Sequence, residues 1–122
     1  MKILESAENY LESILILKEE KGQVRAIDIV NYLGFSKPSV SIALKQLETN
    51  GYINRDDDGF ITLSEEGETI AENIYERHQL LTDMFIKLVV SADTAKQDAC
   101  KIEHYLSQET FNCIKSHYKN NV

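Results

Sequence analysis

The chain has 122 residues, 43% of them hydrophobic, which is enough for one compact unit or for one small domain with a short appendage. No stretch approaches the roughly 20 apolar residues that a membrane-spanning helix needs, and we expect no signal peptide at the start of the chain. The two cysteines, Cys100 and Cys113, are too few for a disulfide framework. These observations exclude a membrane protein and a disulfide-stabilised secreted domain, and they predict a cytoplasmic protein.

The net charge of −7 is unevenly distributed along the chain. Affinity for DNA depends largely on neutralising phosphates, so an acidic chain is not a general nucleic-acid binder. Residues 21–55, however, have a net charge of +3, which leaves −10 for the remainder. The basic residues of this segment are Lys21, Arg25, Lys37, Lys45 and Arg55. Such a local excess is typical of a protein that contacts DNA with one face, whereas the acidic remainder is either metal-binding surface or, as is commoner, solvated helix faces.

Three helices are predicted in the first part of the chain. Apolar residues recur at helical spacing over residues 5–20 and again over residues 25–33, where the pattern stops at Gly34. Ser36 is the expected N-cap of the third helix, which has a proline in its first turn and ends at Gly51. Two helices joined by a short, glycine-containing turn are the signature of a helix-turn-helix.

A β-hairpin and three further helices are predicted next. Tyr52–Arg55 and Phe60–Leu63 are β-prone, and the loop between them consists of three aspartates and a glycine. This hairpin is the wing of a winged helix-turn-helix. A long helix is expected over Ser64–Val90, then, after a polar break, a fifth helix and a sixth that Ser107 caps. The predicted fold is mainly α with a small β-hairpin, with a DNA-binding domain at residues 1–63 and a helical metal-binding and dimerisation domain at residues 64–122.

The third helix is the candidate recognition helix, whose N-terminal residues would face base edges in the major groove. Ser36 and Ser39 can donate hydrogen bonds to phosphates or bases, and Lys37 can pair with phosphate or guanine. Pro38 offers an apolar surface to a thymine methyl group. The alternative is that Ser36 and Pro38 only start the helix. The predicted DNA-binding residues are Arg25, Ser36, Lys37, Pro38, Ser39, Ser41, Lys45 and Arg55.

The long helix offers a surface for a second copy of the chain. The few cations of one chain are too few for strong binding, so we expect a homodimer on a symmetric DNA site. Apolar side chains at helical spacing exceed what so small a domain must bury: Leu80, Leu81, Met84, Phe85 and Leu88. The alternative is that these side chains form a second local core.

Four side chains of the second half could bind a metal ion. Cys100, Glu103 and His104 stand at positions i, i+3 and i+4, so all three can project from one helical face. With His78 they supply thiolate, carboxylate and imidazole, a mixed set suited to a divalent first-row metal. The spacing alone is a weak signal, because surface Glu–His pairs are common and isolated cysteines usually lie in a core.

Six blocks of sequence carry a resemblance to a known family: Ala7–Ile14, Ser36–Ser41, Asn50–Tyr52, Leu63–Gly67, Arg77–Leu81 and Asp98–Ser107. The last block, with Cys-x-x-Glu-His followed by Leu-Ser, is the most specific. Through these blocks the chain resembles the diphtheria-toxin-repressor family of metal-dependent regulators, which includes the iron-dependent repressors and the shorter manganese transport regulators. We expect the short form, without the SH3-like third domain of the iron-dependent repressors.

The resemblance implies a metal site shared by the first helix, the long helix and the helix that carries Glu-His. Glu12 falls on a carboxylate ligand of the manganese branch, and Asn9 stands where that branch has aspartate and the iron branch has methionine. Tyr105 replaces a histidine that is frequent in the manganese branch. Thr82 and Lys96 replace ligands of the iron branch's ancillary site, which we expect to be absent. The predicted metal ligands are Asn9, Glu12, His78, Cys100, Glu103 and His104.

The donor set also bears on which metal is bound. Carboxylate and carbonyl ligands suit Mn(II), while a thiolate favours softer ions such as Fe(II), Co(II) or Zn(II). Because Cys100 supplies a thiolate and Asn9 is uncharged, the predicted metal is Fe(II), with Mn(II) only slightly less favoured. Oxidation of Cys100 is a further reading, but a plain ligand is the simpler one. Cys113 is expected in the core and His117 on the surface.

The predicted function is that of a metal-dependent transcriptional repressor. As a homodimer loaded with Fe(II) or Mn(II), it would bind a palindromic operator in double-stranded DNA and control genes of metal homeostasis. One alternative is a metal-independent winged-helix regulator that senses a small molecule or thiol oxidation; another is a dimeric interaction module that no longer binds DNA. We expect no enzymatic activity, because glycine-rich phosphate loops, nucleophile elbows and paired catalytic carboxylates are missing.

Overall fold

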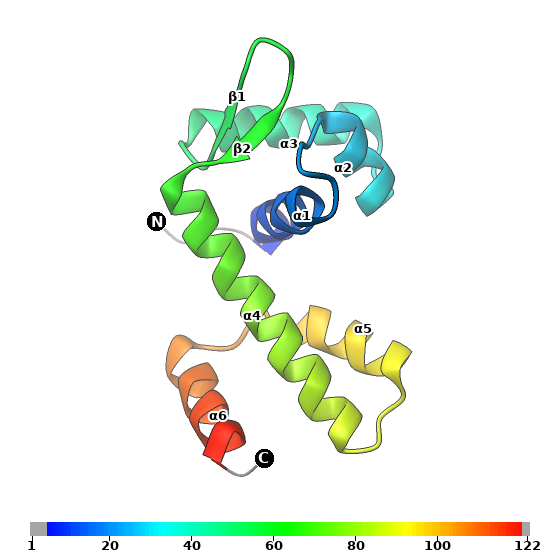
Figure 1. Ribbon diagram of the computed structural model, residues 1–122, viewed down its shortest axis with the longest axis vertical. Coiled ribbons are helices and arrows are strands. Elements are labelled where there is room, and N and C mark those ends of the chain that lie inside the picture. The colour runs from blue at the N-terminus through cyan, green and yellow to red at the C-terminus, as the bar shows by residue number, and fades with distance from the viewer. Residues whose placement is uncertain (1–4, 121–122) are drawn as a thin grey trace. The chain divides into compact units, whose positions relative to one another are not determined.

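The computed structural model describes residues 5–120, except for the side chain of Asn120 (Figure 1). Its elements are α1 (Glu5–Lys21), α2 (Ala26–Leu33), α3 (Lys37–Thr49), β1 (Ile53–Arg55), β2 (Ile61–Leu63), α4 (Glu65–Lys87), α5 (Ala92–Ile102) and α6 (Gln108–Asn120). The chain divides into two compact units, residues 1–72 and 73–122, so the division falls within α4. The predicted order of helices and hairpin is confirmed. No helix of the described segment is both long and apolar enough to cross a lipid bilayer.

Unit 1 is built around α1, which packs against α2, α3 and β2. Leu11 and Ile14 of α1 are fully buried, as are Val40 and Leu44 of α3, because these residues recur on one face of each helix. The N-cap of α3 forms as predicted: the backbone N–H of Ser39 donates to the Ser36 side chain over 3.3 Å. The apolar stripe of α3 is thereby turned inward, and its opposite face is left to solvent.

The hairpin is held by its own turn and by the chain before α2. β1 and β2 are antiparallel, and the N–H of Ile61 also donates to the carbonyl of Val24 over 2.7 Å. In the turn, one carboxylate oxygen of Asp56 accepts from the N–H groups of Asp58 and Phe60, each over 2.9 Å. Asp56 is therefore occupied with holding the turn, while Asp57 and Asp58 project exposed at the wing tip.

The start of α4 is fixed against the end of α3. The hydroxyl of Ser64 donates to the carbonyl of Gly51 over 2.7 Å and accepts from the N–H of Gly67 over 3.1 Å. A Cβ atom at Gly67 would clash with the backbone carbonyl of Tyr52. The two hydrogen bonds of the Ser64 hydroxyl explain the serine at this position, and the close approach of the Tyr52 carbonyl explains the glycine three residues later.

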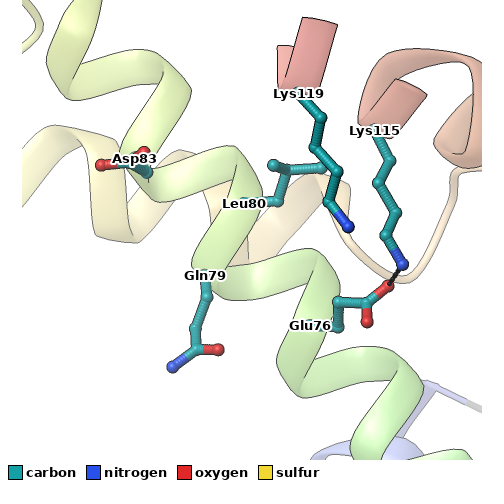
Figure 2. Close-up of a pocket in the computed structure, with 6 residues that line it drawn as sticks. All are labelled: Glu76, Gln79, Leu80, Asp83, Lys115 and Lys119. Atoms are coloured by element: carbon teal, nitrogen blue, oxygen red, sulfur yellow. Dashed lines mark hydrogen bonds and ion pairs between the residues drawn. The ribbon is translucent and has the colours of Figure 1, made fainter. Parts of the chain in front are cut away.

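In unit 2, ion pairs and hydrogen bonds join α4 to α6 along a shallow pocket (Figure 2). The ammonium group of Lys115 lies 2.8 Å from a carboxylate oxygen of Glu76, and the hydroxyl of Tyr118 donates to Asp83. The pocket is lined by Glu76, Gln79, Leu80, Asp83, Lys115 and Lys119. Ser107 caps α6 as predicted, since its hydroxyl accepts from the N–H of Thr110 over 3.1 Å.

The helix α4 ends three residues earlier than predicted, because the chain leaves it in a Schellman turn. The N–H of Val90 donates to the carbonyl of Phe85, and that of Val89 donates to Ile86. Val89 takes the left-handed position with φ of 72°, which is costly for a β-branched side chain, and is 91% exposed. Leu88 beside it is 69% exposed.

These exposures distinguish two parts of the surface predicted for a second copy. Leu81 is buried within unit 2 and belongs to its local core, whereas Leu88 is exposed. Ile86, which was not among the predicted residues, is exposed as well. The prediction for Cys113 is wrong: it is exposed, because Phe111 occupies the inner face of α6 and residues two positions apart point to nearly opposite sides of a helix. His117 is exposed, as predicted.

Candidate metal centre and nucleic-acid interface

Three of the predicted metal ligands come together in unit 2. Glu103 follows α5 directly as its C-cap residue, and its side chain is fully buried. Its Oε2 atom lies 2.9 Å from Nδ1 of His78 on α4, and its Oε1 atom lies 3.5 Å from Nε2 of His104. The side chain of His104 is only 1% exposed. One buried carboxylate is thus flanked by two imidazole rings.

The buried carboxylate of Glu103 is incompletely satisfied. Within the part of the chain that the structure describes, Oε1 has no hydrogen-bond partner, and 3.5 Å to His104 is longer than an ordinary N–H···O bond of about 3 Å. An ionised carboxylate without water needs donors or positive charge to offset the loss of its hydration. A cation beside Oε1 would therefore stabilise the ionised form of this buried carboxylate.

The donor atoms fit a divalent metal ion in type and spacing. Nitrogen and oxygen ligands lie about 2.0–2.2 Å from such ions, so neighbouring ligands are separated by about 3.0 Å in octahedral and about 3.4 Å in tetrahedral coordination. The separations of 2.9 Å and 3.5 Å around Glu103 are close to these values. The His78–Glu103 pair and the Glu103–His104 pair therefore each have a separation that one ion could span, each through a different oxygen atom of the carboxylate.

Arg77 holds the segment that carries two of these ligands, and sequence reasoning missed it. Its guanidinium donates to the backbone carbonyl of Glu103 over 3.0 Å and to that of Leu106 over 2.6 Å. It also donates to the side chain of Gln108 over 3.1 Å and lies over the ring of Phe111 at 5.2 Å. A signal existed: Arg77 falls on the buried stripe of α4, where an unpaired charge would be costly.

Cys100 does not share the buried position of Glu103. It is exposed on α5, whereas Glu103, the C-cap residue of the same helix, is buried. The two predicted ligands of α1 belong to unit 1. Asn9 is half-buried there, and Glu12, one turn further on, is only 8% exposed. The role of all three as ligands stays a prediction.

The predicted DNA-binding residues surround the outer face of α3 in unit 1. Lys37, Pro38, Ser39, Ser41 and Lys45 are all exposed on α3. Ser36 is exposed as well, but its hydroxyl is engaged in the cap, where it also donates to the hydroxyl of Ser39 over 2.9 Å. The helix-starting role of Ser36 is thus confirmed, and its DNA contact stays a prediction.

The flanks of this face are basic. Arg25 is exposed and its guanidinium lies over the ring of Phe60 at 4.3 Å. Arg55 of β1 is half-buried and lies 3.3 Å from a carboxylate oxygen of Glu48. A shallow pocket connects these elements, lined by Ala26, Ile27, Val30, Lys37, Ser41 and Arg55. Lys37 of α3 and Arg55 of the hairpin therefore border one surface, which can approach a phosphate backbone.

Comparison with known proteins identifies a domain family for each half of the chain. Residues 2–59 match the family model described as "Iron dependent repressor, N-terminal DNA binding domain", and residues 64–121 match "Iron dependent repressor, metal binding and dimerisation domain". The transcriptional regulator MntR of Escherichia coli O6:H1 is 36% identical over 91% of this chain and 72% of its own length.

Solved structures share the fold. The metal-dependent transcriptional regulator MtsR superposes with a TM-score of 0.85 over 93% of this chain at 23% identity. A manganese-dependent transcriptional repressor in complex with manganese gives a TM-score of 0.81 over 91% of this chain at 24% identity. The chain spans about half the length of these two structures, 53% and 51% respectively. With both family models matched and a relative of this identity, the chain belongs to the iron-dependent repressor family of transcriptional regulators.

Proposed function

We propose that this chain is a metal-dependent transcriptional repressor that binds a palindromic operator as a homodimer. The observation that carries the proposal is the fully buried Glu103 carboxylate between two histidines, in a chain whose other unit presents a basic recognition helix. A regulator of this kind acts where the chromosome lies, so the proposal includes a cytoplasmic location. It involves no catalysis.

The residues of unit 2 would have distinct roles in holding the metal. Glu103 would contribute its carboxylate, and His78 and His104 would contribute neutral ring nitrogens. A bound divalent ion would supply the positive charge that the buried carboxylate lacks. Arg77 would keep the backbone of Glu103 in place through its hydrogen bond to that residue's carbonyl. The proposal extends to Asn9, Glu12 and Cys100, and for these it rests on the family resemblance.

The metal is proposed to be Mn(II) or Fe(II). The preference for Fe(II) rests on Cys100 and Asn9 alone, whereas the buried set around Glu103 has only nitrogen and oxygen donors, which suit either ion. Among the structural neighbours, one is described as a manganese-dependent repressor in complex with manganese. Titration of the metal-free protein with each ion, under anaerobic conditions for Fe(II), decides between them.

Metal binding and operator binding are proposed to strengthen each other. The candidate recognition helix lies in unit 1, and Glu103 and its two histidines lie in unit 2. Linkage requires that a metal which raises DNA affinity is itself bound more tightly in the presence of DNA. Two copies of the recognition helix on a symmetric site would double the phosphate contacts that one chain can make. The exposed Ile86 and Leu88 of α4 are proposed to contribute to the contact between the copies.

The test measures DNA affinity with and without metal. Double-stranded DNA would be enriched from a random pool by the protein in the presence of Mn(II) or Fe(II), and its affinity measured by fluorescence anisotropy. We expect the affinity to fall at least tenfold when a chelator removes the metal, and to return when metal is added back. Glu103→Gln should abolish this response, whereas Glu109→Gln, at an exposed carboxylate of α6, should preserve it. Equal affinity with and without metal would refute the metal dependence.

A further inference from the structure

The outer face of α3 contains an isoleucine for which the fold provides no partner surface. Ile42 is 62% exposed, although the buried stripe of α3 is already complete with Val40, Leu44 and Leu47. A single exposed apolar side chain is ordinary in itself. Its position suggests a contact with another molecule, because Ile42 lies directly opposite that stripe, at the middle of the solvent-exposed face of α3.

The neighbours of Ile42 on this face are the residues expected at DNA. Pro38 lies one turn before it, and Ser39 and Lys45 lie three residues to either side, so the four side chains share one surface of the helix. Pro38 and Ile42 form an apolar strip along the helix, and Ser39 and Lys45 border it with polar groups. A recognition helix in the major groove would bring the middle of this strip to the base edges.

Among the four base pairs, only those with thymine offer an apolar group in the major groove. The C5 methyl group of thymine can pack against an aliphatic side chain, whereas the exposed edges of adenine, guanine and cytosine carry donors and acceptors that isoleucine cannot satisfy. Covering those polar edges with Ile42 would remove water from them without replacing its hydrogen bonds. The side chain therefore favours thymine and opposes the other bases.

We propose that Ile42 is a specificity-determining residue that reads the C5 methyl group of a thymine in each half-site of the operator. The inference rests on the proposed function, since it requires that α3 enters the major groove. It adds the identity of a base and the chemical group that is read. Pro38 would read a separate position, because it lies a full helical turn away from Ile42.

The test removes single methyl groups from the DNA. Each thymine of the enriched operator would be replaced in turn by deoxyuridine, which differs only in lacking the C5 methyl group, and the affinity would be measured with metal present. At one symmetric position we expect a loss of about fourfold per half-site, the value of one buried methyl group. The Ile42→Ala variant should bind the thymine operator more weakly and show no further loss on the deoxyuridine operator.

Two further variants make the assignment specific. Ile42→Val, which keeps a branched aliphatic side chain, should retain the preference for thymine over deoxyuridine. Tyr32→Ala, at a tyrosine of α2 that is 48% exposed, should leave the discrimination at this position unchanged. Thermal unfolding of each variant verifies folding, which we expect to be unaffected at such exposed positions.

The outcomes separate the inference from the proposed function. If the wild-type protein binds every deoxyuridine operator as tightly as the thymine operator, or if Ile42→Ala loses as much as the wild type does, the inference is overturned while metal-dependent DNA binding stands. If no DNA is enriched at all, the proposed function fails and the inference falls with it. A loss at one symmetric position that Ile42→Ala abolishes supports it, and a loss at another position that Ile42→Ala retains would belong to Pro38.

Discussion

The two compact units of this chain differ in what they bury. Of the largest fully buried side chains in unit 1, all but Ser13 are apolar, among them Leu11, Ile14 and Leu44. In unit 2 that group consists of Phe111, Ile74 and the charged Glu103. Burying apolar surface stabilises a fold in any buffer, whereas burying a carboxylate stabilises it only when a positive charge is supplied. The apolar core of unit 1 should therefore contribute the same stability with and without metal, whereas the stability of unit 2 around Glu103 should follow the metal concentration.

The largest expected effect concerns the apolar core of unit 1. Leu44→Ala removes a fully buried side chain and should lower the free energy of unfolding by about 3 kcal/mol, within the usual range for such cavities. The loss should be the same with and without metal in urea unfolding. Ile42→Ala on the same helix is the control and should cost less than about 0.5 kcal/mol, because Ile42 is exposed. A metal-dependent cost for Leu44→Ala would contradict the contrast between the units.

The second prediction concerns the buried charge of unit 2. At 100 times its dissociation constant, a metal should raise the free energy of unfolding of the wild-type protein by about 2.7 kcal/mol. Glu103→Gln should remove this gain and leave the metal-free protein within about 1 kcal/mol of the wild type, because it eliminates a buried charge and keeps the shape. Differential scanning calorimetry with and without Mn(II) measures both values. Glu109→Gln should keep the full gain.

The third prediction concerns the strained end of α4. Val89→Asn should raise the free energy of unfolding by about 1 kcal/mol, because asparagine adopts the left-handed conformation far more readily than a β-branched residue. Chemical unfolding at low protein concentration measures it. The same variant should weaken self-association in sedimentation experiments, since Val89 stands 91% exposed beside Leu88. A loss of stability instead would show that burial of Val89 in the dimer outweighs the strain.

The smallest expected effect returns to unit 1. The backbone N–H of Arg25 donates to the carboxylate of Asp28, and this bond, together with Lys21 at 3.1 Å, lowers the pKa of Asp28. A lowered pKa in the folded state contributes stability above about pH 4 that is lost as the pH falls through the folded-state pKa. Asp28→Asn should therefore cost about 0.5–1 kcal/mol near neutral pH, as for other helix N-terminal carboxylates, and nothing near pH 2. Urea unfolding at several pH values checks the difference.

Local sequence signals were sufficient for most of the fold. Ser36, Ser107 and the glycines at helix ends act through hydrogen bonds and dihedral angles within a few residues, so helix starts and the hairpin could be predicted. The end of α4 could not be predicted, because no sequence pattern indicates that a valine will adopt a left-handed conformation. The same holds for Gly67, whose requirement comes from the approach of Tyr52, fifteen residues earlier in the chain.

The candidate metal centre was predictable in part. Helical spacing and the family resemblance identified Glu103 and His104, but the spacing could not tell that Glu103 is buried while Cys100, three residues earlier, is exposed. Arg77 was missed because its partners are backbone carbonyls 26 and 29 residues away, which no local pattern reports. A residue that holds a metal ligand in place, as Arg77 does for Glu103, is therefore harder to recognise from sequence than the metal ligand itself.

The aspartates at the wing tip have a consequence for how such a protein would search a genome. Asp56, Asp57 and Asp58 are all exposed and present three negative charges on the hairpin beside the candidate recognition helix, and Asp56 also accepts the hydrogen bonds of the turn. Any duplex repels these charges regardless of its sequence, so they lower the affinity for the operator and for random DNA by the same factor. Each stop on random DNA during a search is then shorter, and the contacts to bases have to supply the operator affinity that the wing gives up.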